Sequence, residues 1–88
     1  MYDLDMDNVW KWREKNPLRA WRVLQGGMFQ STVALRIGVA TQTVRDWEAG
    51  SRNPNPDNFA ALAHFMGVDI QALADQWDNW IAAARVNR

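Results

Sequence analysis

Residues 30–49 read QSTVALRIGVATQTVRDWEA and are the most informative segment of the chain. Its apolar residues recur at intervals of three and four, the spacing that buries one face of an α-helix. Gly38 interrupts the pattern and predicts a turn with a positive φ, because glycine adopts that backbone conformation without steric cost. We therefore expect two short helices, one on each side of Gly38, with Gly50 ending the second.

An apolar wedge shared by the two helices is expected to fix the angle between them. Its members are Val33, Ile37, Val44 and Trp47. Ala34 is small, which allows the two helices to cross closely. A second helix held in this way can place its outer face in the major groove of duplex DNA, which is about 12 Å wide.

The outer face of the second helix carries side chains that can read base edges. At about 100° per residue, the positions opposite the wedge are Gln42, Arg45, Asp46 and Ala49. Glutamine can pair bidentately with adenine, arginine with guanine, and aspartate can accept from the cytosine amine. Thr41, at the helix start, can also reach a base edge. Gln30 begins the preceding helix and is placed to contact a phosphate.

The flanking sequence predicts further helices. Asn16-Pro17 is typical of a capping residue followed by proline at the first helical position, and Asp69 can cap a last helix. The apolar positions expected to be buried in these helices are Leu18, Trp21, Leu24, Phe59, Leu62, Ala63, Met66, Ile70, Leu73, Ala74, Trp77, Ile81 and Ala84. No stretch alternates convincingly with period two, so the prediction is an all-α fold of about five helices. Residues 9–12 can add a short helix upstream.

Length and composition exclude several classes of protein. The 88 residues suffice for one compact domain and not for two, and the absence of cysteine excludes disulfides and thiolate metal sites. No apolar run approaches the ~20 residues of a membrane span, and no signal-peptide pattern opens the chain. We therefore expect a cytoplasmic protein, associated with the nucleoid. His64 has no nearby ligand set and the carboxylates are scattered, so we expect no enzyme, metal, cofactor or small-molecule ligand.

Charge is unevenly distributed although the net charge is zero. Residues 13–52 carry seven basic and three acidic side chains, whereas residues 1–12 and 53–88 are acidic. A basic centre of this size is only a weak indication of nucleic-acid binding. The neutral total charge, Asp46 and the acidic ends instead favour a protein partner.

Several positions in residues 30–50 coincide with those of a known family. Glutamine opens the motif at Gln30, and Ala34, Gly38, Val44 and Trp47-Glu48-x-Gly50 follow at the family's spacing. Asn16 to Arg22, Arg52-Asn53-Pro54 and Pro56 to Leu73 are similar to the family's flanking helices. Over residues 16–74 the chain resembles the Cro and lambda-repressor-like family, also called the xenobiotic-response-element family. The resemblance implies a lambda-repressor-like five-helix domain, with a short N-terminal extension at residues 1–15 and a lengthened C-terminal helix through residues 75–88.

The resemblance also implies roles for individual side chains. The family's base-reading positions fall on Thr41, Gln42, Arg45 and Asp46. Contacts to the DNA backbone are implied for Gln30 and Thr43, and more loosely for Arg22, Arg36 and Arg52, each of which could equally be a solvated surface residue.

Three positions depart from the family pattern. Gly26-Gly27 lengthens the first turn by one residue. Phe29 stands where a capping serine or threonine is usual, so either Ser31 caps the helix or the helix starts late. Asp46 stands where a polar or basic residue is commoner, and its charge opposes the phosphates unless it meets a cytosine amine or pairs with Arg45.

The tryptophans near the two ends allow two interpretations. Trp77 and Trp80 can pack within the chain against Trp10 and Trp12, closing the core where the ends meet. Alternatively, the helix pairs with its own copy across a two-fold axis. The residues of that dimer interface would be Trp77, Trp80, Ile81 and Ala84. The same helix can also serve both purposes, with Trp77 facing inward and Trp80 outward.

Together these features predict a sequence-specific transcriptional regulator of bacterial or phage type, a repressor in the first instance. It would bind double-stranded DNA as a homodimer, formed beforehand or only on a palindromic operator. The alternative is a protein-binding adaptor on the same fold, such as an antitoxin or a phage accessory factor.

Overall fold

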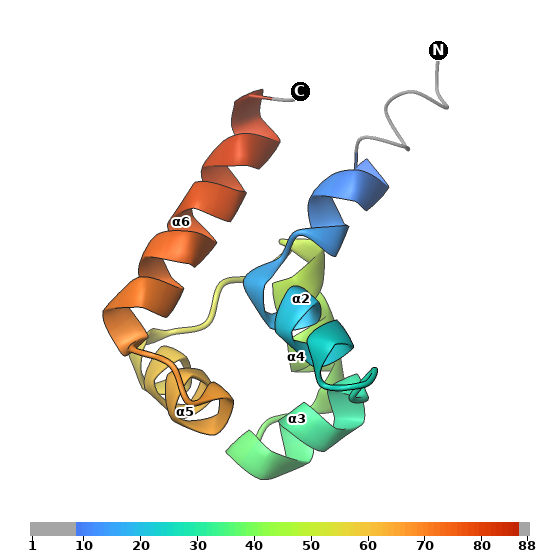
Figure 1. Ribbon diagram of the computed structural model, residues 1–88, viewed down its shortest axis with the longest axis vertical. Helices are drawn as coiled ribbons and strands as arrows, with labels where there is room; N and C mark the ends of the chain where they lie inside the picture. Colours follow the sequence, from blue (N-terminus) through green and yellow to red (C-terminus); the bar gives the residue numbers. More distant parts are fainter. Residues whose placement is uncertain (1–8, 87–88) are drawn as a thin grey trace.

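The computed structural model describes residues 9–86, which are mainly helical and contain no strand (Figure 1). A helical stretch at residues 9–14 comes first. The following helices are α2 (Pro17–Leu24), α3 (Gln30–Ile37), α4 (Thr41–Ala49), α5 (Pro56–Met66) and α6 (Ile70–Val86). The all-α prediction is confirmed. Residues 1–8, which hold three of the N-terminal acidic side chains and most of the expected extension, lie outside the described residues, as do residues 87–88.

Capping residues set most of the helix boundaries. The Oδ1 atom of Asn16 accepts from the backbone N–H groups of Leu18 and Arg19, both at 3.0 Å, and Pro17 follows at the first helical position. Asp69 caps α6 as expected, accepting from the N–H of Ala72 at 3.0 Å. These side chains satisfy N–H groups that have no partner within the helix.

Helices α3 and α4 form the expected pair. Gly38 ends α3 with φ of 79° and Gly50 ends α4 with φ of 77°, both in the left-handed region. Helix α3 begins at Gln30 with no side-chain cap, so the expectation that Ser31 caps it or that it starts late is wrong.

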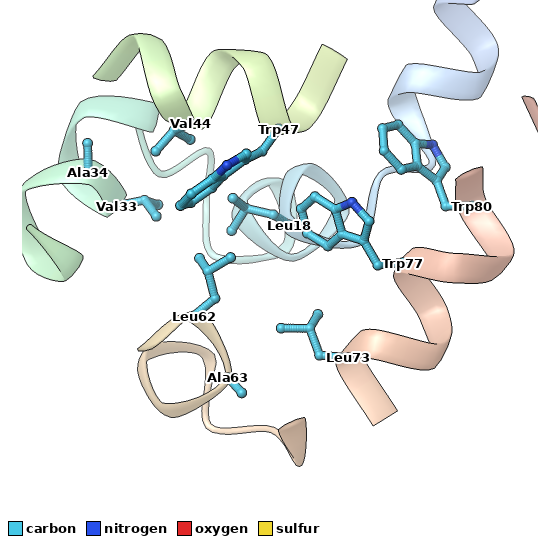
Figure 2. Packing of buried hydrophobic residues seen from close by; sticks show 10 residues of the cluster. All are labelled: Leu18, Val33, Ala34, Val44, Trp47, Leu62, Ala63, Leu73, Trp77 and Trp80. Carbon is cyan, nitrogen blue, oxygen red and sulfur yellow. The ribbon is translucent and has the colours of Figure 1, made fainter. Parts of the chain in front are cut away.

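One apolar core joins all the helices (Figure 2). Its buried members are Leu18, Val33, Ala34, Val44, Trp47, Leu62, Ala63, Leu73, Trp77 and Trp80. The wedge between α3 and α4 is confirmed, with Ile37 half-buried against it. Leu24 and Ile70 were expected in the core and are exposed instead, because each lies at the end of its helix beyond the packed turns.

The residue 9–14 helix and α6 close the core at one end. The ring of Trp12 stacks on that of Trp80, and the ring of Trp77 meets Trp80 and Phe59 edge to face. Trp77 and Trp80 are buried in this packing, which corresponds to the intramolecular interpretation. They therefore offer almost no surface to a second copy of the chain. Ile81 and Ala84 are half-buried, and Trp10 is largely exposed. No helix within residues 9–86 combines the length and the apolar character needed to cross a membrane.

Candidate nucleic-acid interface

Helix α4 is buried along one face and open along the other. Val44 and Trp47 point into the core, where they meet Val33 and Ala34 of α3 (Figure 2). Gln42 and Arg45 are exposed on the opposite side. The two short helices therefore form a rigid unit in which α3 supports α4 from behind.

The expected base-reading residues are all on α4, with two levels of exposure. Gln42 and Arg45 are exposed, whereas Thr41, at the first position of the helix, and Asp46 are partly buried. Among the expected backbone contacts, Thr43 and Gln30 are partly buried, and Arg36 and Arg52 are exposed. These residues come from α3, α4 and the segment after α4, which are consecutive in the chain.

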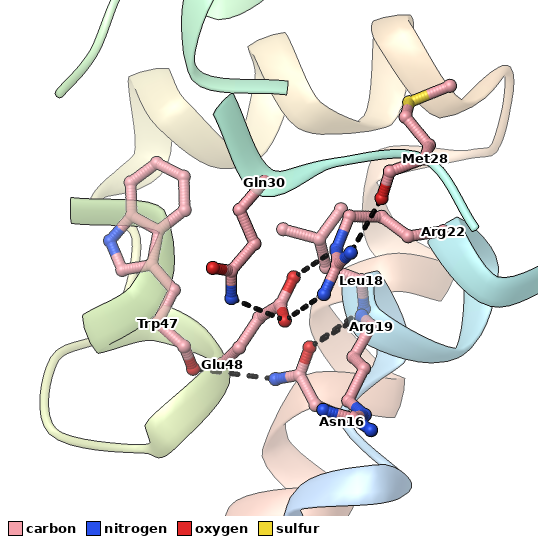
Figure 3. A network of polar contacts seen from close by, with 8 residues as sticks. All are labelled: Asn16, Leu18, Arg19, Arg22, Met28, Gln30, Trp47 and Glu48. Atoms are coloured by element: carbon pink, nitrogen blue, oxygen red, sulfur yellow. Dashed lines mark hydrogen bonds and ion pairs between the residues drawn. The ribbon is translucent and has the colours of Figure 1, made fainter. Parts of the chain in front are cut away.

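Behind this surface lies a buried ionic network (Figure 3). The Nε and Nη2 atoms of Arg22 donate to the two carboxylate oxygens of Glu48 at 2.7 and 2.6 Å, while Nη1 donates to the carbonyl oxygen of Met28 at 2.6 Å. The side chains of Arg22 and Glu48 are only 12% and 5% exposed. A bidentate pair of this kind fixes geometry as well as charge. It ties α2 to the end of α4 and to the residues that lead into α3.

The buried pair gives Arg22 a different role from the one the resemblance implied. All three guanidinium nitrogens of Arg22 donate inside the protein, so this side chain supports the helix pair and does not extend toward a ligand. The sequence carries a signal for the burial of Glu48 but none for the identity of its partner. Glu48 follows Val44 by four residues, which places it on the buried face of α4, where a carboxylate needs a cationic partner.

Gln30 belongs to the same network. Its Nε2 atom donates to Oε1 of Glu48 at 3.1 Å, so the side chain is anchored while remaining partly exposed. The adjacent start of α3 has no side-chain cap, and neither has the start of α4. Uncapped first turns leave backbone N–H groups that favour an anionic partner.

Asn16 makes a second link behind α4. It is fully buried, and its Nδ2 atom donates to the carbonyl oxygen of Trp47 at 3.4 Å while its Oδ1 caps α2 (Figure 3). The start of α2 is therefore tied to the last turn of α4. The Asn16-Pro17 pattern predicts the cap on α2 but not the contact with Trp47, which is 31 positions away in the sequence.

The open face of α4 carries its own polar contacts. Nε2 of Gln42 donates to Oδ1 of Asp46 at 3.0 Å, and Nη1 of Arg45 donates to Oε1 of Gln42 at 3.4 Å. Asp46 and Arg45 thus both contact Gln42. Within the residues described, no group of three or more histidine or carboxylate side chains is arranged to hold a metal ion.

A family model described as helix-turn-helix matches residues 18–73, which includes the whole of α3, α4 and α5. The chain belongs to the Cro/C1-type helix-turn-helix family. As a member of this family it is a DNA-binding regulator with a lambda-repressor-like fold. Searches of curated proteins and of solved structures gave no match.

Family membership implies that the chain binds double-stranded DNA. The match begins at Leu18 and ends at Leu73. The stacked Trp12 and Trp80 lie outside it, one on each side.

Proposed function

We propose that this helix-turn-helix protein represses transcription by inserting α4 into the major groove of a specific operator, in a bacterium or phage. The observation that carries the proposal is the division of α4 into two faces. Val44 and Trp47 are buried, while Gln42 and Arg45, side chains that can pair bidentately with adenine and guanine, are exposed. Thr41 contributes from the first turn of the helix.

Contacts to phosphate are assigned to the surroundings of α4. Arg36 and Arg52 are exposed and cationic, and Gln30 is anchored beside the uncapped start of α3. Thr43 lies on the first turn of α4, close to its uncapped start. Such contacts orient the protein on the duplex and supply affinity without reading sequence.

A dimer is part of the proposal because α4 is short. Nine residues of helix contact few base pairs, and two copies on a palindrome double the number of positions read. Half-sites are then expected about 34 Å apart, or a multiple of that distance. Ile81 and Ala84 are the members of the expected interface that keep some exposed surface.

The experiment that tests the proposal is selection of bound duplexes from a random pool, followed by a mobility-shift titration. The expected result is an enriched palindrome whose binding weakens with rising salt. Gln71 on α6 provides a matched control for Gln42. Its Nε2 atom donates to Oδ1 of Asp75 at 2.9 Å, the same i to i+4 pairing as between Gln42 and Asp46. Gln71→Ala is expected to select the same palindrome as the wild type. A pool without enrichment would contradict the proposal.

A protein-binding adaptor, such as an antitoxin or a phage accessory factor, is a second candidate. It is favoured by a shallow apolar groove between α2 and the α5–α6 turn, lined by Trp21, Leu24, Met66 and Val68. Leu24 is 82% exposed there, and together with its neighbours it gives the groove a contiguous apolar lining of the kind that binds proteins. If the groove serves a protein partner, Leu24→Ser is expected to leave DNA selection unchanged and to weaken binding of that partner.

A further inference from the structure

Gln42 lies between two side chains of opposite charge on the open face of α4. Its Nε2 atom donates to Oδ1 of Asp46 at 3.0 Å, and its Oε1 atom accepts from Nη1 of Arg45 at 3.4 Å. The three residues occupy positions i, i+3 and i+4, which are neighbours on a helix surface. Both contacts are charge-assisted, and the contact with Asp46 is the shorter of the two.

The two charges select one orientation of the Gln42 amide. Rotating the amide by half a turn would place its oxygen against the carboxylate of Asp46 and its NH₂ group against the guanidinium of Arg45. Both contacts would then be repulsive. An amide between neutral neighbours has no such preference, and it can present its donor and its acceptor in either order.

The oriented amide keeps free hydrogen-bonding capacity. A glutamine side chain has two N–H donors and two acceptor lone pairs, and the contacts with Asp46 and Arg45 use one of each. One donor and one acceptor remain. Adenine presents the complementary pair in the major groove, an acceptor at N7 and a donor at N6.

We propose that Asp46 is a positioning residue that orients Gln42, and that it does not itself read a base. This inference rests on the proposed function, since it assumes that Gln42 reads a base pair. Asp46 is partly buried whereas Gln42 is exposed, which agrees with a carboxylate that lies behind the reading group. The role explains why an acidic residue stands on a surface that meets phosphates.

A positioning carboxylate has opposite effects on affinity and on specificity. Its negative charge repels the DNA backbone whatever the sequence, so it lowers the affinity for all duplexes. Its contact with Gln42 restricts the amide to one orientation, so it raises the preference for one base pair. Asp46→Ala is therefore expected to bind scrambled DNA more tightly and to discriminate less.

The experiment measures base preference at every operator position for the wild type, Gln42→Ala, Asp46→Ala and the double variant. A bidentate contact gives a preference of about 5- to 150-fold at one base pair. Asp46→Ala is expected to lower that preference by about threefold or more, and to do so at the same base pair as Gln42→Ala. In the Gln42→Ala background, adding Asp46→Ala is expected to change no base preference.

Three results would overturn the positioning role. Loss of preference at a different base pair, additive with that of Gln42→Ala, would show that Asp46 reads a base directly. Unchanged preferences in Asp46→Ala would show that the contact with Gln42 has no effect on DNA. A wild-type protein that selects no sequence contradicts the proposed function itself, and the positioning role with it.

Two further variants separate positioning from a general effect on folding or charge. Asp75→Ala removes the equivalent carboxylate from the Gln71–Asp75 pair on α6 and is expected to leave every base preference unchanged. Asp46→Asn keeps an acceptor but loses the charge that disfavours the flipped amide. Its preference at the Gln42 base pair is expected to lie between those of the wild type and Asp46→Ala, and a preference below that of Asp46→Ala would contradict the role.

Discussion

The indole rings of Trp12 and Trp80 lie face to face, with their centroids 4.2 Å apart and their planes within 4° of parallel. Each indole N–H donates to the backbone carbonyl of the other residue, at 2.5 Å from Trp12 and 2.6 Å from Trp80. The two residues are 68 positions apart in the sequence. This reciprocal pair joins the residue 9–14 helix to α6 and closes the core over Trp77.

The pair is expected to contribute strongly to stability. Trp80→Ala removes a buried aromatic ring and should lower the free energy of unfolding by about 3–5 kcal/mol. Trp10→Ala is the matched control, because Trp10 is 52% exposed, with the guanidinium of Arg13 5.5 Å from the centre of its ring. Trp10→Ala should lower the free energy of unfolding by about 1 kcal/mol or less. Urea denaturation measures both values, and similar losses in the two variants would contradict the packing described for Trp80.

Gly38 and Gly50 should respond differently to substitution by alanine. Both have positive φ, 79° and 77°, which costs a residue with a Cβ about 1–2 kcal/mol. A Cβ on Gly38 meets no atom within 4 Å, whereas one on Gly50 would overlap the ring of Trp12. Gly50→Ala is therefore expected to destabilise the protein more than Gly38→Ala, as measured by thermal melting. Equal destabilisation would indicate that Trp12 does not pack on the last turn of α4.

The Arg22–Glu48 pair predicts strong coupling between two substitutions. Glu48→Ala leaves the guanidinium of Arg22 buried without its carboxylate and should lower the free energy of unfolding by about 3–5 kcal/mol. The Arg22→Ala/Glu48→Ala variant should lose less than the sum of the two single variants, by about 1 kcal/mol or more. A denaturant double-mutant cycle measures this difference. Additive losses would mean that the two side chains act independently.

Salt dependence distinguishes Arg52 from Arg22 on DNA. If Arg52 contacts a phosphate, Arg52→Ala should weaken binding evenly across sequences and reduce the slope of log affinity against log salt by about 1. Lys15→Ala is a suitable control, since Lys15 faces the groove between α2 and α6. Folded Arg22→Ala should keep the wild-type slope, because its guanidinium is already paired inside the protein. A reduced slope in Arg22→Ala together with a wild-type slope in Arg52→Ala would mean that Arg22, and not Arg52, contacts a phosphate.

Local signals were enough to predict most of the helix boundaries. Asn16-Pro17, Gly38 and Gly50 each act through the backbone of neighbouring residues, so their effect can be read from short stretches of sequence. The wedge of α3 and α4 is also confirmed, because its spacing reflects the helical period. The exposed positions of Gln42 and Arg45 follow from the same period.

Contacts between distant residues could not be predicted in the same way. The Arg22–Glu48 pair spans 26 positions and the Trp12–Trp80 pair spans 68. Their partners are decided by how whole helices pack, and no local pattern specifies that packing. The buried position of Glu48 could have been read from the sequence, but the identity of its partner could not.

Reading of base pairs by the open face of α4 can be measured directly. The most direct measurement is the ratio of affinities for the selected operator and for a scrambled duplex of the same length, in the wild type and in Gln42→Ala/Arg45→Ala. We expect the double variant to lose most of this ratio, about tenfold or more, while remaining folded and still binding DNA. A double variant that keeps the wild-type ratio would show that Gln42 and Arg45 do not read base pairs.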